Sequence, residues 1–148
     1  MFAPDETERK RLRARIRKLE RRIELDSKNA ELMQRLGKYH CKLDDNDKAE
    51  ECFRKAIALD PLDPWSRLYL SNIHYARKHY EPALDEARRA SEVAPSEAMP
   101  WVSIGDALSC LGRDEGADFA YRKAVEVDPK SPVAKRNLRR WKAIQARR

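Results

Sequence analysis

Three histidines and three cysteines carry the most reactive side chains in this 148-residue chain. His40 and His74 are 34 residues apart, and Leu108 follows His74 at the same interval. Because leucine takes the same place, the spacing indicates a repeated packing position. We therefore interpret His40 and His74 as interior side chains and not as catalytic or metal-binding groups. His79 stands alone at an expected helix turn.

The cysteines, Cys41, Cys52 and Cys110, form neither a paired disulfide framework nor a close metal-binding spacing. The chain has four glycines and no glycine-rich phosphate loop, and no nucleophile lies at a recognisable spacing from a base. We predict no catalytic residue, no cofactor and no metal, so the protein is not expected to be an enzyme. No stretch approaches the ~18 apolar residues of a membrane helix. We expect no membrane span and a cytoplasmic location.

The elements that position these side chains recur at a fixed interval of 34 residues. The recurring columns are Pro61, Pro95 and Pro129; Ala49, Ala83 and Ala117; Ala56, Ala90 and Ala124; Leu36, Leu70 and Ile104; and Gly37, Ser71 and Gly105. Such a period is typical of an array of helical repeats. Each repeat predicts two antiparallel helices, and the proline ends the second helix because it lacks the N–H that a helix needs.

The third copy, residues 98–131, resembles the tetratricopeptide repeat (TPR) family. The matching residues are Trp101, Ile104, Gly105, Ala117, Tyr121, Ala124 and Pro129. In the middle copy, Ser71 replaces the family glycine and Ala87 the aromatic residue, which we expect to loosen the packing there. The resemblance implies an all-α fold, a right-handed superhelical α-solenoid of antiparallel helix pairs.

The expected organisation has five parts. Residues 1–29 form a basic N-terminal helix that packs as a half-repeat, residues 30–63, 64–97 and 98–131 are TPR 1, TPR 2 and TPR 3, and residues 132–148 form a basic C-terminal capping helix. The expected helices are 5–25, 30–43, 47–60, 64–77, 81–94, 98–111, 115–128 and 132–148. A dimerising coiled coil, and hence a homo-oligomer, is the alternative for the first helix, although its two heptads fall short of the usual three or four.

The resemblance also implies a concave groove lined by the first helix of each pair. The groove positions are Gln34, Lys38, Trp65, Leu68, Asn72, Tyr75, Met99, Val102 and Asp106. We expect the large apolar members of this set to be exposed, and contiguous exposed apolar surface usually marks a binding site. We therefore predict a protein-protein interaction adaptor or scaffold that binds a peptide or helix of a partner protein. The alternative is internal packing of Trp65 and Met99, or a groove covered by the N-terminal helix.

One subset of TPR proteins holds the carboxylate end of chaperone tails with lysine, asparagine and arginine at fixed positions. The matching residues here are Gln34, Lys38, Tyr69, Met99 and Ser103. None is the residue that the subset requires at its position, so we predict no chaperone-tail clamp.

The net charge of +7 is unevenly distributed. Residues 9–22 carry nine cations and one acid, and residues 130–148 carry eight cations and no acid. The candidate basic patches are Arg13, Arg17 and Arg21 near one end, and Arg136, Arg139 and Arg140 near the other. Such patches favour a nucleic acid or an acidic surface as an alternative partner, with solvated helix faces as the simpler interpretation. A secretion-type chaperone is a further alternative.

Overall fold

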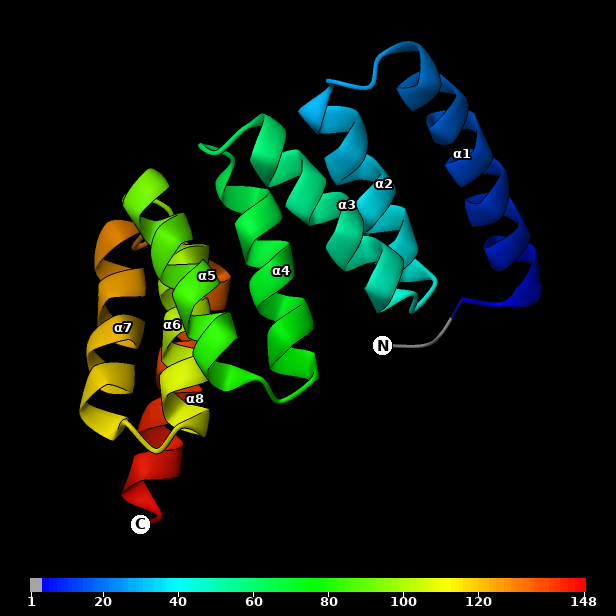
Figure 1. The fold of residues 1–148 in the computed structure, drawn as a ribbon. Coiled ribbons are helices and arrows are strands. Elements are labelled where there is room, and N and C mark those ends of the chain that lie inside the picture. Colours follow the sequence, from blue (N-terminus) through cyan, green and yellow to red (C-terminus); the bar gives the residue numbers. More distant parts are fainter. Residues whose placement is uncertain (1–3) are drawn as a thin grey trace. The chain divides into compact units, whose positions relative to one another are not determined.

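The structure, a computed structural model, describes residues 4–148, so the first three residues of the predicted N-terminal part lie outside it. Within that range the chain is entirely helical apart from its turns (Figure 1). The helices are α1 (Glu6–Leu25), α2 (Ala30–Lys42), α3 (Asn46–Leu59), α4 (Pro64–Ala76), α5 (Tyr80–Val93), α6 (Ala98–Cys110), α7 (Asp114–Val127) and α8 (Pro132–Ala146). Each begins and ends within two residues of its predicted bounds, so the all-α prediction is confirmed.

Side-chain caps explain several of these boundaries. Asp5, Asn29, Asp45 and Ser131 each accept a hydrogen bond from the backbone N–H three residues later. Each cap satisfies a donor that the first helical turn leaves without a partner. The periodic prolines follow the last residues of α3, α5 and α7 by two positions, where the helix has already ended.

The chain divides into two compact units, residues 1–66 and residues 67–148. In the first unit, α1 packs on α2, and α2 packs on α3. Ile16 and Leu19 of α1 are buried in one cluster with Leu32, Leu36 and Cys52. The apolar seam of α1 is therefore covered within its own unit, which leaves little of it for a dimerising coiled coil.

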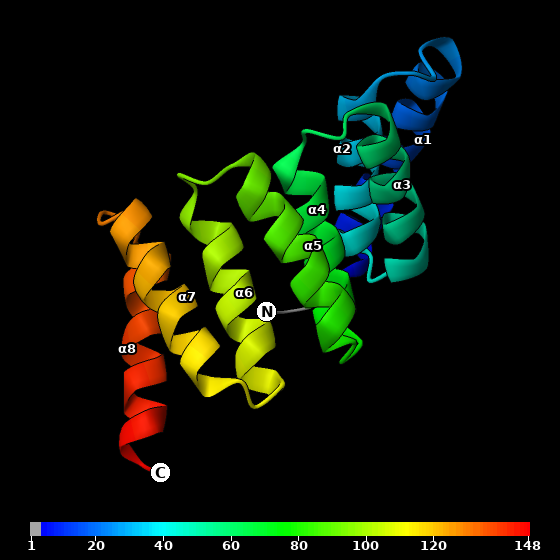
Figure 2. The ribbon, with the colours of Figure 1, turned by 60° about the vertical axis from the view of Figure 1, so that its left-hand side comes forward.

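The second unit contains α4 from Arg67 onward and α5 to α8. Its core cluster consists of Leu84, Ala87, Ile104, Ala107, Leu108, Ala117, Ala120, Tyr121 and Trp141. Figure 2 shows α8 lying beside α7, from which Asp118 accepts a 3.2 Å hydrogen bond from the indole N–H of Trp141. The last helix therefore covers the apolar side of α7 and contributes its own aromatic ring to the core.

The periodic glycines lie beneath aromatic rings. A Cβ added at Gly37 would lie 2.8 Å from the Phe53 ring, and one added at Gly105 would lie 2.7 Å from the Tyr121 ring. In the middle copy the ring is absent, and Ser71 fills the space with a hydroxyl that donates a 2.8 Å hydrogen bond to the Ala83 carbonyl. The two departures from the TPR pattern are thus one coupled change. Both Ser71 and Ala87 are buried, and looser packing at this position stays a prediction.

Candidate functional site

The predicted groove residues of the first unit have different surroundings. The Gln34 amide donates a 2.8 Å hydrogen bond to the Asp63 carboxylate. Asp63 also accepts from the backbone N–H groups of Trp65 and Ser66, at 2.9 and 3.2 Å, and so caps α4. Gln34 therefore holds a turn in place, whereas the Trp65 side chain is 44% exposed and Lys38 is exposed.

In the second unit the expectation of exposure is wrong for Leu68 and Val102, which are only 5% and 4% exposed. Val102 is buried with Ala98, Ala124 and Ala134, at the place where α6 meets α8. The first helix of one pair packs on the first helix of the next, so a position that points away from its own partner helix is still covered. Leu68 precedes Val102 by one 34-residue period, and we attribute its burial to the same cause.

The other groove positions of the second unit include three exposed side chains. Asn72, Tyr75 and Met99 are exposed, Tyr75 to 38% and Met99 to 36%. The exposed Cys110 thiol donates a 3.3 Å hydrogen bond to the Tyr75 hydroxyl. Pairing with Cys110 and partial burial raise the pKa of Tyr75. We call Asn72, Tyr75, Met99 and Cys110 the α4–α6 face.

Asp106 is not a free groove carboxylate. It accepts a 2.6 Å hydrogen bond from the Tyr121 hydroxyl and a 3.4 Å hydrogen bond from Arg140. Burial raises the pKa of Asp106, while these two donors act in the opposite direction. Asp106 thus ties α6 to α7 and α8. Arg140, predicted as part of a basic patch, is one of its partners, and the 34-residue spacing between the two could have indicated this.

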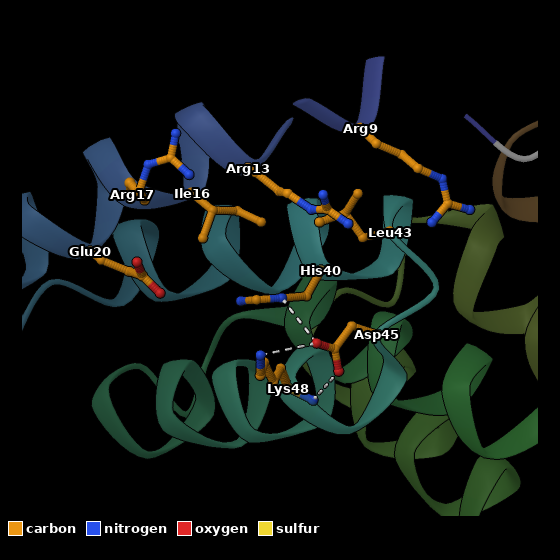
Figure 3. A pocket seen from close by; sticks show the side chains of 9 residues that line it. All are labelled: Arg9, Arg13, Ile16, Arg17, Glu20, His40, Leu43, Asp45 and Lys48. Atoms are coloured by element: carbon orange, nitrogen blue, oxygen red, sulfur yellow. Dashed lines mark hydrogen bonds and ion pairs between the residues drawn. The ribbon is translucent and has the colours of Figure 1, made fainter. Parts of the chain in front are cut away.

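A pocket of about 380 Å³ lies where α1 meets the end of α2 and the start of α3 (Figure 3). Its lining residues are Arg9, Arg13, Ile16, Arg17, Glu20, His40, Leu43, Asp45 and Lys48. One Asp45 carboxylate oxygen lies 3.7 Å from His40 Nδ1 and 3.4 Å from Lys48 Nζ. We call this site the mixed-charge pocket, because its arginines share it with two carboxylates.

The histidines of the repeated position are interior, as predicted, since His40 and His74 are both buried. Burial lowers the pKa of His40, and the nearby Asp45 only partly opposes this effect. The Nδ1 atom of His40 makes no hydrogen bond, so this histidine is interior without being fully satisfied.

A second pocket of the first unit, of about 210 Å³, lies between α1 and α2. It is lined by Arg15, Arg35, Lys38, Tyr39 and Lys42. Four cations line it and no carboxylate does, so we call it the cationic pocket. Of its residues, only Lys38 belonged to the predicted groove. The prediction from the sequence grouped cations of α1 into one basic patch, because the sequence does not show which of them face α2.

The remaining members of the predicted basic patches lie apart from this pocket. Arg13 is 3.9 Å from Glu6, and Arg17 lines the mixed-charge pocket. Arg21, Arg136 and Arg139 are exposed. The predicted patches therefore divide into residues with acidic neighbours and residues that face solvent.

Cys41 and Cys52 are poor candidates for a reactive thiol, because the thiolate is the nucleophilic form. All three cysteines are free, and burial raises the pKa of Cys41 and of Cys52 to about 11. Among residues 4–148, no group of three or more His, Cys, Asp or Glu side chains could hold a metal ion. No helix in the same range is both long and apolar enough to cross a membrane.

Comparisons with known proteins point to one family. The family described as Cilia and flagella-associated protein 70 middle TPR-like domain matches residues 3–131. Small glutamine-rich tetratricopeptide repeat-containing protein 2 of Mycosarcoma maydis is 34% identical over 116 residues, which are 76% of this chain and 32% of that protein. The chain spans about a third or less of the length of the curated relatives that it matches.

Solved structures agree on the fold. MamA matches with a TM-score of 0.80 and 20% identity, over 98% of this chain and 87% of that chain. The first TPR of Spaghetti (RPAP3), bound to the HSP90 peptide SRMEEVD, matches with a TM-score of 0.72 and 22% identity, over 79% of this chain and 93% of that chain. The TPR solenoid predicted from the sequence is therefore confirmed.

Proposed function

We propose that this chain, which belongs to the family of the Cilia and flagella-associated protein 70 middle TPR-like domain, binds a segment of a partner protein and contributes no catalysis. TPR domains are stacks of helix pairs, and such stacks offer extended binding surfaces. The RPAP3 domain, similar in fold, is bound to a peptide, which supports a peptide or helix as the ligand here.

The observation that carries the proposal is the α4–α6 face. Tyr75 and Met99 remain partly exposed there, although most large apolar residues of the second unit are buried. Tyrosine and methionine are enriched in the contact surfaces of protein complexes. Asn72 and Cys110 add polar groups beside them. We infer that different apolar side chains of the partner segment contact Tyr75 and Met99, because Tyr75 pairs with Cys110 at the end of α6 whereas Met99 lies at the start of that helix. We also infer that Asn72 pairs with the segment's backbone.

The ligand proposed here is not a chaperone tail held by its terminal carboxylate. Of the five positions that would form such a clamp, Gln34 is occupied by its bond to Asp63, and Met99 and Tyr69 carry no positive charge. The recognition therefore depends on side chains of the partner segment and not on the end of its chain.

Peptide selection followed by titration tests this proposal. Peptides selected on the intact chain from a random phage-displayed library are titrated calorimetrically against the wild-type chain, Met99→Glu and Leu25→Glu. We expect Met99→Glu to weaken binding about tenfold or more, or about 1.4 kcal/mol, because the contact would desolvate a carboxylate. Leu25→Glu makes the same chemical change at a site that is 90% exposed and should leave affinity unchanged. Equal affinity for all three proteins would contradict the proposal.

A further inference from the structure

We propose that the cationic pocket of the first unit is a second binding site, and that it takes an acidic segment of a partner protein through Arg15, Arg35, Lys42 and Tyr39. Arg15 comes from α1 and the other three from α2, so the pocket exists only because the two helices pack together. The site shares no residue with the α4–α6 face, and it stands whether or not that face binds a peptide.

The contrast with the mixed-charge pocket carries the argument. In that pocket, Asp45 accepts from the Lys48 backbone and lies close to Lys48 Nζ and His40, and Glu20 lines the same space (Figure 3). An incoming anion would meet two carboxylates there. The lining of the cationic pocket has four cations and no carboxylate, so an anion that enters it meets a net positive charge.

The cations of this pocket also repel one another. Arg35, Lys38 and Lys42 follow at steps of three and four along α2, which places them on one helix face. Arg35 lies 4.0 Å from Glu31, which is largely exposed. Like charges at these spacings destabilise a helix, so a bound anion lessens their mutual repulsion.

Tyr39 gives the pocket a fixed wall. Its ring packs against the cluster that contains Leu32, Leu36 and Ile16, so its position is set by the core of the first unit. Its hydroxyl can donate a hydrogen bond to a carboxylate. Arginine binds a carboxylate through two parallel N–H donors, and Arg15 and Arg35 supply this geometry from two different helices.

The shape of the charged surface favours a protein segment over a nucleic acid. Duplex DNA presents a phosphate every ~1.7 Å of its axis and is held by cations that follow its length. Here four cations gather in one small pocket, and the neighbouring arginines of α1 share their own pocket with Glu20 and Asp45. One or two carboxylates of a peptide match such a site.

Two charge-reversal pairs on the intact chain test the inference. Arg15→Glu with Lys42→Glu alters the cationic pocket, and Arg13→Glu with Arg17→Glu alters the mixed-charge pocket. Both pairs change the net charge equally and involve exposed side chains. The probe is a fluorescein-labelled peptide with four consecutive Asp and Glu residues and blocked termini, and its Asn and Gln counterpart is the control.

At 0.15 M salt, where charges beyond about 8 Å are largely screened, we expect the Arg15 and Lys42 pair to weaken peptide binding about tenfold or more. The Arg13 and Arg17 pair should weaken it less than about threefold, because those cations lie outside the site. The neutral peptide should not bind. Met99→Glu should bind the acidic peptide as the wild-type chain does, which separates this site from the α4–α6 face.

Several results would overturn the inference. Equal losses for the two pairs would show general attraction to a basic protein, and no binding by the wild-type chain would remove the site. Tighter binding of a 12-nucleotide single-stranded RNA, lost with the same Arg15 and Lys42 pair, would assign the pocket to nucleic acid. If circular dichroism shows that a reversed pair unfolds, Arg15→Gln with Lys42→Gln and Arg13→Gln with Arg17→Gln make the same comparison.

Discussion

The two units of this chain treat their charged side chains differently. In the second unit, acids and bases pair across helices: Asp106 with Arg140, Asp114 with Arg148, and Glu81 with Arg113. In the described part of the first unit, the α1 cations with a polar partner are Arg9, which donates to the Pro4 carbonyl, and Arg13, which lies 3.9 Å from Glu6. The second unit uses such pairs within its structure, whereas the first presents most of its α1 cations to solvent.

The difference shows that charge counts alone are a poor guide to a binding surface. Both basic ends of the chain carry an excess of eight positive charges. Near the C-terminal end, the 34-residue period places Arg140 and Arg148 beside acids of the preceding helices, one period earlier in the sequence. Arg140 and Arg148 are therefore already structural partners, whereas the cationic pocket lies at the N-terminal end.

The largest effect that we predict concerns the aromatic position of the first unit. Phe53→Ala should lower the free energy of unfolding by about 3–5 kcal/mol, because Phe53 is fully buried. Gly37→Ser alone should lower the free energy of unfolding by about 1–3 kcal/mol, because it forces a side chain against the Phe53 ring. Urea unfolding followed by circular dichroism measures both.

The second unit already contains the serine and alanine combination, at Ser71 and Ala87. In the Phe53→Ala background, Gly37→Ser should therefore cost much less than it does alone. Additive costs would contradict the coupling between glycine and ring inferred from the structure.

The next effect tests the difference in charge use directly. Asp106→Ala should lower the free energy of unfolding by about 1–3 kcal/mol, because it leaves the buried Tyr121 hydroxyl without its acceptor. Arg15→Ala, which removes an exposed cation of the first unit, should change it by no more than about 0.5 kcal/mol. If the two substitutions cost the same, the comparison between the units is wrong.

A smaller effect concerns pH and the first unit. Because the pKa of His40 is lowered in the fold, the unfolded chain binds a proton that the folded chain resists. Stability should therefore fall as pH drops below the ordinary histidine pKa of about 6.5. Asp45, Glu20 and Glu51 lessen the fall, and Lys48 adds to it.

His40→Leu places at residue 40 the amino acid found at the same repeat position in α6, Leu108. The urea concentration at the unfolding midpoint should then change less between pH 7.5 and 5.5 than it does for the wild-type chain. His79→Gln, at an exposed histidine, should keep the wild-type slope. Parallel curves for the wild-type chain and His40→Leu would exclude His40 as the cause.

The last prediction is that blocking the C-terminal carboxylate of a peptide ligand leaves its affinity unchanged. The peptide SRMEEVD, which is bound by the RPAP3 domain of similar fold, should have the same affinity for this chain with a free or an amidated C-terminus. Any binding would come from its acidic side chains, since the clamp residues are absent. A large loss on amidation, measured by fluorescence anisotropy, would show a terminal-carboxylate clamp.

Much of the fold follows from the sequence because its signals are local. The 34-residue period and the prolines after α3, α5 and α7 predict the helix bounds to within two residues. The interior position of His40 and His74 could also be predicted, because Leu108 shares their position in the repeat.

The candidate site was less predictable because the burial of a side chain depends on the helices that pack against it as well as on its position in its own helix. Rotation about a helix axis places Val102 away from its partner helix, but does not show that Ala134 of α8 covers it. The cationic pocket depends on which face of α1 meets α2. Ile16 and Leu19 form the buried apolar seam of α1, but the sequence does not show that Arg15, beside that seam, lines a pocket with Arg35 and Lys42.

The most direct test of the account is a nuclear magnetic resonance titration of the ¹⁵N-labelled intact chain with the blocked acidic peptide. We predict that amide shifts change in α1 near Arg15 and in α2 from Arg35 to Lys42, and that α8 is unaffected despite its own cations. Shifts that are largest in α8, or equal at the two basic ends, would contradict the conclusion that the cationic pocket of the first unit takes the acidic segment.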